Sequence, residues 1–127
     1  MHAPKEKTRQ ALIAIVDDDQ SFREALEGLL KLIGFRTAVF ASARNFLESP
    51  QFPSVSCAIL DVSMPGMDGL ELQRHLAATH PIPIIFITDL RDAKTREQAV
   101  RAGAISFLNK PVSEETLIDA LNSALRA

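Results

Sequence analysis

The sequence is poor in the features that mark disulfide-bonded, membrane-spanning or nucleic-acid-binding proteins. Its single cysteine, Cys57, cannot form an internal disulfide, and its apolar neighbours favour a buried core side chain over a reactive thiol. The apolar runs are too short to span a bilayer, and no secretory signal follows the polar residues 1–10. Because 14 basic residues nearly balance 16 acidic ones, charge gives no reason to expect nucleic acid or a membrane surface as a direct partner. The simplest prediction is a cytoplasmic protein with a flexible terminus at residues 1–10.

Five short apolar runs alternate with five helical patterns over residues 11–127. Continuous apolar runs of this length are typical of strands that are covered on both faces. Their alternation with helices predicts one α/β domain, a doubly wound parallel sheet with helices on both faces. The predicted strands are residues 11–16, residues 35–40, a segment ending at Asp61, residues 84–87 and residues 104–108.

Two of the predicted helices differ in how strongly they are expected to pack. The helix after Gly69 is expected to turn Leu70, Ala77 and either His75 or Leu76 inward. The helix at residues 91–102 has few apolar side chains, so it is predicted to be loosely held.

Polar side chains follow four of the five predicted strands. Asp17 and Asp18 come after the first strand, Asp61 after the third, Thr88 after the fourth and Lys110 after the fifth. In an open α/β sheet these ends meet at one edge. Carboxylates suit Mg²⁺, whereas a lysine and a hydroxyl suit phosphate oxygens, so the set predicts a phosphoryl site beside a metal, with an aspartate as nucleophile.

Each of these residues also has an ordinary explanation. Asp17, Asp18 and Asp19 could cap a helix, Thr88 could simply favour a strand, and Lys110 could be a surface lysine. Their joint occurrence at the ends of separate strands favours the site.

Four segments together form a specific motif: Val16-Asp17-Asp18-Asp19, Asp61-Val62-Ser63-Met64-Pro65-Gly66-Met67-Asp68-Gly69, Thr88 and Lys110-Pro111. This motif resembles the receiver domain of bacterial two-component response regulators, the CheY-like superfamily. The resemblance covers residues 12–125, and we expect residues 11–127 to form the receiver domain. It implies a flavodoxin-like five-stranded sheet in the order 2-1-3-4-5.

The resemblance also implies a role for each residue of the motif. Asp61 would accept a phosphoryl group from a histidine kinase or phosphotransfer domain, which makes the chain a regulatory phosphoacceptor rather than an enzyme. Mg²⁺ would be bound by Asp18, Asp61 and the main-chain carbonyl of Ser63, with Asp17 acting through water. The remaining implied roles are the switch hydroxyl for Thr88, the phosphate's counter-ion for Lys110 and a cis peptide bond before Pro111.

Phosphorylation would act through charge. A phosphoryl group adds roughly two negative charges and three acceptor oxygens, which unphosphorylated Asp61 does not offer to Thr88. Thr88 is expected to move inward only then, leaving space that Phe107 fills; the alternative for Phe107 is plain core packing. The surface that would change is formed by the fourth helix, the fifth strand and the fifth helix.

Two residues depart from the family pattern. Asp89 stands where a small residue is usual, and its carboxylate would disfavour phosphorylation unless it caps the helix expected near Arg91. Capping is the preferred interpretation. Phe107 replaces a common tyrosine, so no phenolic hydroxyl can contact a partner there.

Two other functions compete with an active receiver. A degenerate receiver would act by protein–protein binding alone. Asp89 favours this alternative, because its carboxylate would disfavour phosphorylation. A Mg²⁺-dependent phosphatase with an aspartyl intermediate would use Asp17 and Asp19 as a D-x-D pair, but the chain has no room for a cap domain. A flavin module is disfavoured because the acidic edge repels a cofactor phosphate.

The output of the domain is suggested only by resemblance. The segments 39–43 and 107–111 are similar to receivers of helix-turn-helix transcription regulators of the FixJ/NarL type. This favours the N-terminal part of a longer regulator over a stand-alone receiver, with no direct DNA contact by these residues. Homodimerisation on phosphorylation is expected through the fourth helix and fifth strand, or through the first and last helices.

Overall fold

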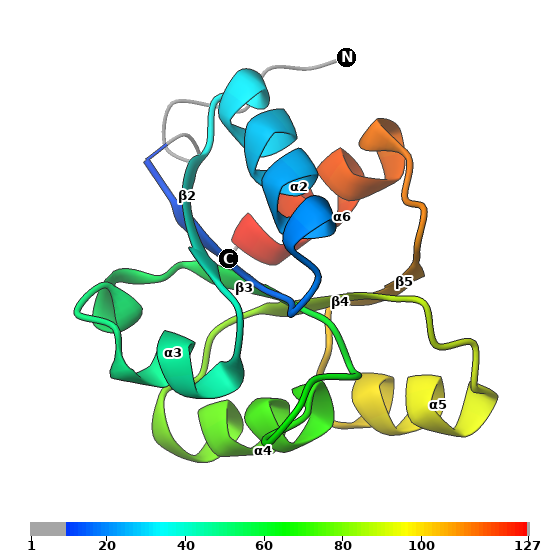
Figure 1. The fold of residues 1–127 in the computed structure, drawn as a ribbon. Coiled ribbons are helices and arrows are strands. Elements are labelled where there is room, and N and C mark those ends of the chain that lie inside the picture. The colour runs from blue at the N-terminus through cyan, green and yellow to red at the C-terminus, as the bar shows by residue number, and fades with distance from the viewer. Residues whose placement is uncertain (1–9, 127) are drawn as a thin grey trace.

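A single parallel sheet forms the middle layer of the computed structural model, which describes residues 10–126 (Figure 1). The strand order is β2-β1-β3-β4-β5, which confirms the predicted topology. The strands are β1 (Leu12–Val16), β2 (Arg36–Phe40), β3 (Cys57–Leu60), β4 (Ile84–Thr88) and β5 (Ser106–Asn109). The predicted flexible segment lies outside the described residues, apart from its last residue.

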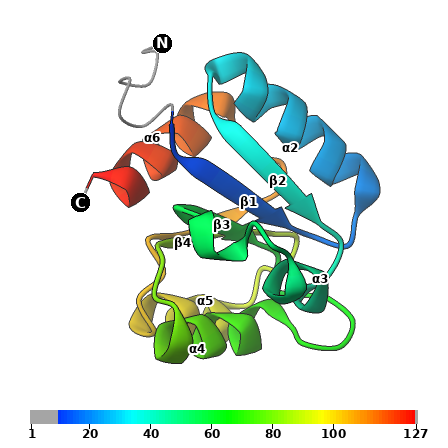
Figure 2. The same cartoon turned by 90° about the vertical axis from the view of Figure 1, so that its left-hand side faces the viewer.

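Helices cover both faces of the sheet (Figures 1 and 2). One face carries α2 (Gln20–Ile33) and α6 (Glu114–Leu125), and the other carries α3 (Ala43–Glu48), α4 (Gly69–Thr79) and α5 (Ala93–Arg101). A short 3₁₀ turn, η1 (Phe52–Ser54), precedes β3. Within residues 10–126, none of the helices has the length and apolar character needed to cross a membrane.

The strands supply both cores because alternate side chains point to opposite faces. In β1, Ile13 and Ile15 pack toward α2 and α6, whereas Leu12, Ala14 and Val16 pack toward the other three helices. Both sets are buried, which explains why the strand is a continuous apolar run. The buried Cys57 belongs to the core on the side of α2 and α6, and burial raises the pKa of its thiol to about 12.

The inward face of α4 differs in part from the prediction, whereas that of α5 agrees with it. In α4, Leu76 is buried, but His75 and Ala77 are exposed. The prediction for Ala77 is wrong because the capping box of Asp68 and Glu71 sets the helix phase so that Leu72, Gln73 and Leu76 face the sheet. In α5 only Thr95 and Ala99 are buried, in line with a helix held by few apolar contacts.

The start of α4 lies against the end of β3. Gly69 N donates to Val62 O at 2.8 Å, and an added Cβ at Gly69 would lie 2.2 Å from Asp61 O and 2.9 Å from Val62 Cα. Both neighbours are backbone atoms, which have little freedom to yield. Only glycine therefore allows α4 to begin this close to Asp61.

We predict that Gly69→Ala lowers the free energy of unfolding by about 2 kcal/mol or more, because the new methyl group overpacks against backbone. Gly28→Ala is the matched control. Gly28 lies inside α2 with nothing within 4 Å of an added Cβ, so alanine should stabilise by about 0.5–1 kcal/mol. Urea denaturation measures both changes, and equal effects at the two positions would refute the close-approach explanation.

Candidate phosphoryl-transfer site

The residues predicted from the strand ends meet at one edge of the sheet. Asp17 follows β1, Asp61 follows β3, Thr88 ends β4 and Lys110 follows β5. Asp17, Asp61 and Thr88 are buried, whereas Asp18 is exposed. The topology places β1 between β2 and β3 and β4 between β3 and β5, so these ends lie side by side.

Both carboxylate oxygens of Asp61 have partners. Oδ1 accepts from the Thr88 hydroxyl at 2.6 Å and from the main-chain N–H of Ser63 at 3.2 Å. Oδ2 lies 3.2 Å from the ammonium of Lys110. The side chain is therefore fixed in orientation by three different segments of the chain.

Lys110 joins the two buried acids. Its Nζ lies 2.8 Å from Asp17 Oδ2 and 3.2 Å from Asp61 Oδ2. Burial of part of this side chain favours the neutral amine, but the contact with Asp17 and the charges of Asp17 and Asp61 outweigh it, so the pKa of Lys110 is raised. Lys110 thus carries a full positive charge between the acids. The Lys110–Pro111 peptide bond is cis, as the resemblance implied.

The acids fit a divalent cation. Asp17, Asp18 and Asp61 each offer an oxygen, and these oxygens lie within 4.8 Å of one another. Asp17 Oδ2 is buried at ion-pair distance from Lys110 but outside hydrogen-bond geometry. Burial, the largest cause, and the charge of Asp61 raise the pKa of Asp17 despite Lys110. Three carboxylates facing one ammonium are the oxygen-rich, negatively charged surroundings that Mg²⁺ requires.

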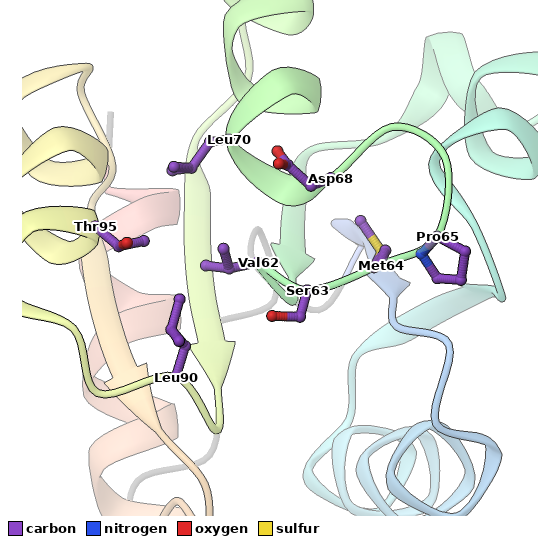
Figure 3. A pocket seen from close by; sticks show the side chains of 8 residues that line it. All are labelled: Val62, Ser63, Met64, Pro65, Asp68, Leu70, Leu90 and Thr95. Carbon is purple, nitrogen blue, oxygen red and sulfur yellow. The ribbon is translucent and has the colours of Figure 1, made fainter.

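A cavity of about 610 Å³ opens beside the segment that follows β3 (Figure 3). Leu90 and Thr95 face Val62 and Leu70 across it, and Ser63, Met64, Pro65 and Asp68 complete its lining. The cavity separates the 62–70 segment from the beginning of α5.

Thr88 departs from the sequence-based expectation. Its hydroxyl donates to the Asp61 carboxylate, so the prediction that this carboxylate offers it no attraction is wrong. An ionised carboxylate is itself a strong acceptor for a hydroxyl. Phe107 is buried, with its ring centroid 5.7 Å from that of Phe86. Thr88 therefore faces Asp61 while the Phe107 ring is buried beside Phe86.

The capping interpretation of Asp89 is also wrong. Helix α5 begins at Ala93, two residues later than predicted, and Asp92 is its N-cap, accepting from Lys94 N at 3.2 Å. Asp89 is exposed and lines a groove together with Phe22 and Lys110.

Sequence reasoning missed the residues that brace the site. Asn109 Nδ2 donates to Thr88 O at 3.1 Å and to Leu90 O at 2.9 Å, and Arg91 donates to Lys110 O at 3.1 Å. Together these bonds tie the segment after β4 to the end of β5. An asparagine at a strand end gives no local signal of its partner strand, so the pattern alone did not identify it.

Known proteins resemble this chain over nearly its whole length. A family model described as the response regulator receiver domain matches residues 13–122. The chain is 44% identical over 119 residues to response regulator protein TmoT of Ectopseudomonas mendocina, covering 93% of the chain and 54% of TmoT. It is 36% identical over 120 residues to transcriptional regulatory protein FixJ of Bradyrhizobium diazoefficiens, covering 94% and 58%.

A solved structure of a response regulator has a similar fold. The response regulator StyR matches with a TM-score of 0.83 at 44% identity, covering 92% of this chain and 60% of the StyR chain. The chain spans a little more than half the length of the curated relatives TmoT and FixJ.

We predict that Asp17→Asn raises the free energy of unfolding at pH 7 without Mg²⁺, because the raised pKa of Asp17 shows that folding disfavours its charged form. A raised pKa means that the folded chain holds the Asp17 proton more tightly than the unfolded chain. The Asp17 contribution to stability is therefore lost as pH rises from the ordinary carboxyl value of 3.8 through the folded pKa. The gain from asparagine should consequently shrink toward about pH 4, where protonated Asp17 resembles asparagine.

Asp119→Asn, at an exposed acid of α6, is the control and should change stability by less than about 0.5 kcal/mol. Mg²⁺ should stabilise the wild type more than Asp17→Asn. A variant that is destabilised at pH 7 without Mg²⁺ would contradict the charge argument.

Proposed function

Because the chain belongs to the response regulator receiver domain family, we propose that it is a phosphoacceptor switch of a two-component system that takes a phosphoryl group onto Asp61. The observation that carries this proposal is the geometry of Asp61. One of its oxygens faces Lys110, the other faces Thr88, and Asp17 and Asp18 stand beside it. An acid held between a cation and a hydroxyl suits phosphoryl transfer, in which catalysis is mostly positioning and charge stabilisation.

The proposed donor is the phosphohistidine of a histidine kinase or phosphotransfer domain. An Asp61 oxygen forms the new bond to phosphorus while the bond from phosphorus to the histidine nitrogen breaks, and the electron pair stays on that nitrogen. Lys110 compensates charge on the phosphoryl oxygens, and the Thr88 hydroxyl donates to one of them. Asp17, Asp18, Asp61 and the Ser63 carbonyl would hold Mg²⁺, which supplies further charge compensation when bound.

The proposed output is transcription control through an attached or separate domain. FixJ is a transcriptional regulatory protein, and the curated relatives extend well beyond the matched region. The surface proposed to change is α5, β5 and α6. On it, Val100 and Ile105 are 51% and 42% exposed, which supports homodimerisation there after phosphorylation. A cytoplasmic location, with no direct nucleic-acid or membrane contact, completes the proposal.

A degenerate receiver that acts by binding alone is the second candidate, and the position of Asp89 favours it. An exposed carboxylate beside Lys110 repels an incoming phosphate. The phosphatase alternative loses its D-x-D pair, because the Asp19 side chain caps α2 by accepting from Phe22 N. A regulatory phosphoacceptor without turnover of its own is therefore preferred over an enzyme.

We predict that acetyl phosphate with Mg²⁺ adds one phosphoryl group to the wild type and none to Asp61→Asn, because the nucleophile is lost. Intact-protein mass spectrometry measures the addition. Cys57→Ala is the matched control and should be labelled like the wild type, since this buried thiol has a raised pKa. An unlabelled wild type would favour the degenerate receiver, and a labelled Asp61→Asn would place the acceptor elsewhere.

We also predict that Asp89→Ala accelerates labelling by acetyl phosphate about fivefold. An exposed charge a few ångströms from a phosphate is worth about 1 kcal/mol in water-like surroundings, which corresponds to roughly this factor. Labelling rates at low and high salt measure the effect, which should shrink as salt screens the charge. Asp119→Ala should leave the rate unchanged, and an equally fast rate in that variant would rule out a local effect of Asp89.

A further inference from the structure

The ammonium of Lys110 has a third neighbour besides the two acids. Nζ lies 4.1 Å from the centroid of the Phe22 ring, so the ring covers the ammonium. The Lys110 side chain is only 10% exposed, although it follows the last strand at the edge of the sheet. Asp17, Asp61 and Phe22 thus enclose the charged group.

The position of Phe22 is itself fixed by the beginning of α2. Its main-chain N–H donates to Asp19 Oδ1 at 3.2 Å. The next residue, Arg23, donates from its guanidinium to Asp17 O at 2.8 Å. The main chain of Phe22 is therefore held at the N-cap of α2, and the next residue is tied to the chain just after β1, which fixes where the ring starts.

An aromatic ring suits this position for two reasons. The face of the ring carries negative charge density that attracts an ammonium, and the attraction is larger where water is excluded. Lysine also has a flexible four-carbon stem, so its charged end needs an external contact to stay in one place. The acids attract Nζ from one side, and Phe22 covers it on another.

We propose that Phe22 is a positioning residue for phosphoryl transfer, which holds the Lys110 ammonium over Asp17 and Asp61. With Phe22 in place, the charge that compensates the incoming phosphoryl group is already located before the donor arrives. Its effect on the transfer rate rests on the proposed phosphoacceptor function, whereas its contact with Lys110 does not. Phe22 also lines the groove that contains Leu29 and Val112, so simple packing is the competing explanation.

Phe22→Leu and Phe22→Tyr separate the two explanations in the full chain. Leucine keeps an apolar side chain but removes the ring face, whereas tyrosine keeps the ring. With phosphoramidate and Mg²⁺, Phe22→Leu should be phosphorylated on the order of threefold to thirtyfold more slowly than the wild type. Phe22→Tyr should stay within about twofold of the wild type, as expected if the ring and not its volume matters.

Leu29→Ala is the packing control, because Leu29 lines the same groove two turns along α2. It should lower stability and leave the phosphorylation rate unchanged. Equal rates for Phe22→Leu and the wild type would overturn the proposal. So would equally slow rates for Phe22→Leu and Phe22→Tyr, or slowing by Leu29→Ala to the same extent as by Phe22→Leu.

A second measurement does not depend on phosphorylation. Protons above an aromatic ring are shifted upfield, so the ε-methylene protons of Lys110 should resonate upfield in the wild type and in Phe22→Tyr but not in Phe22→Leu. If the wild type takes up no phosphoryl group, the proposed function fails and this NMR shift alone decides whether Phe22 holds Lys110. The same Lys110 shift in Phe22→Leu and the wild type would overturn the proposal.

Discussion

The ion pairs of Lys110 with Asp17 and Asp61 are the interaction on which the carboxyl edge of the sheet depends. Two buried carboxylates at this edge repel each other, and burial alone already disfavours the charged form of Asp17. Lys110 offsets part of this cost but leaves more negative than positive charge. Uncompensated buried charge lowers the stability of the fold, but it raises the affinity of the site for cations. It also favours ligands that bind together with a cation, such as a phosphoryl group with Mg²⁺. This imbalance supports the proposal that the edge binds Mg²⁺ and a phosphoryl group.

The parallel sheet is what makes such a concentration of charge possible. Each strand delivers its residue to the same edge, because all five run in one direction. The chain after β3 must then leave without covering Asp61, and Gly69 permits this by letting α4 start against the backbone of Asp61 and Val62. The fold therefore keeps Asp61 anchored by backbone contacts while its carboxylate stays within reach of Lys110 and Thr88.

The sequence pattern predicted a parallel sheet and the residues that meet at its edge, because both follow from local features: continuous apolar runs, and polar residues where four of these runs end. The strand order came only from the resemblance to receiver domains. The pattern could not predict contacts between side chains on different helices and strands. Asp89 was misjudged because Asp92, three residues later, is the residue that caps α5. Phe22 fitted an apolar stripe of α2, and nothing in that stripe indicates a ring over Lys110. Gln73 was not among the residues expected to face inward in α4, yet it is buried and its amide donates to Ala99 O at 2.9 Å.

The position of Thr88 changes what a phosphoryl group has to do. Its hydroxyl is bonded to the Asp61 carboxylate, so the proposed phosphorylation would replace one charged acceptor by a stronger one instead of creating a new attraction. A ligand can shift a two-state equilibrium only by the difference in its interaction with the two states. The free energy available to the proposed switch is therefore the difference between a carboxylate and a phosphoryl group as partners of Thr88 and Lys110. Asn109 of β5 bonds to Thr88 O and to Leu90 O, so it joins the end of β4 and the segment leading to α5 to the last strand. Within α5 only Thr95 and Ala99 are buried. If the switch operates as proposed, a helix held by so few contacts would need only a small difference in free energy to move.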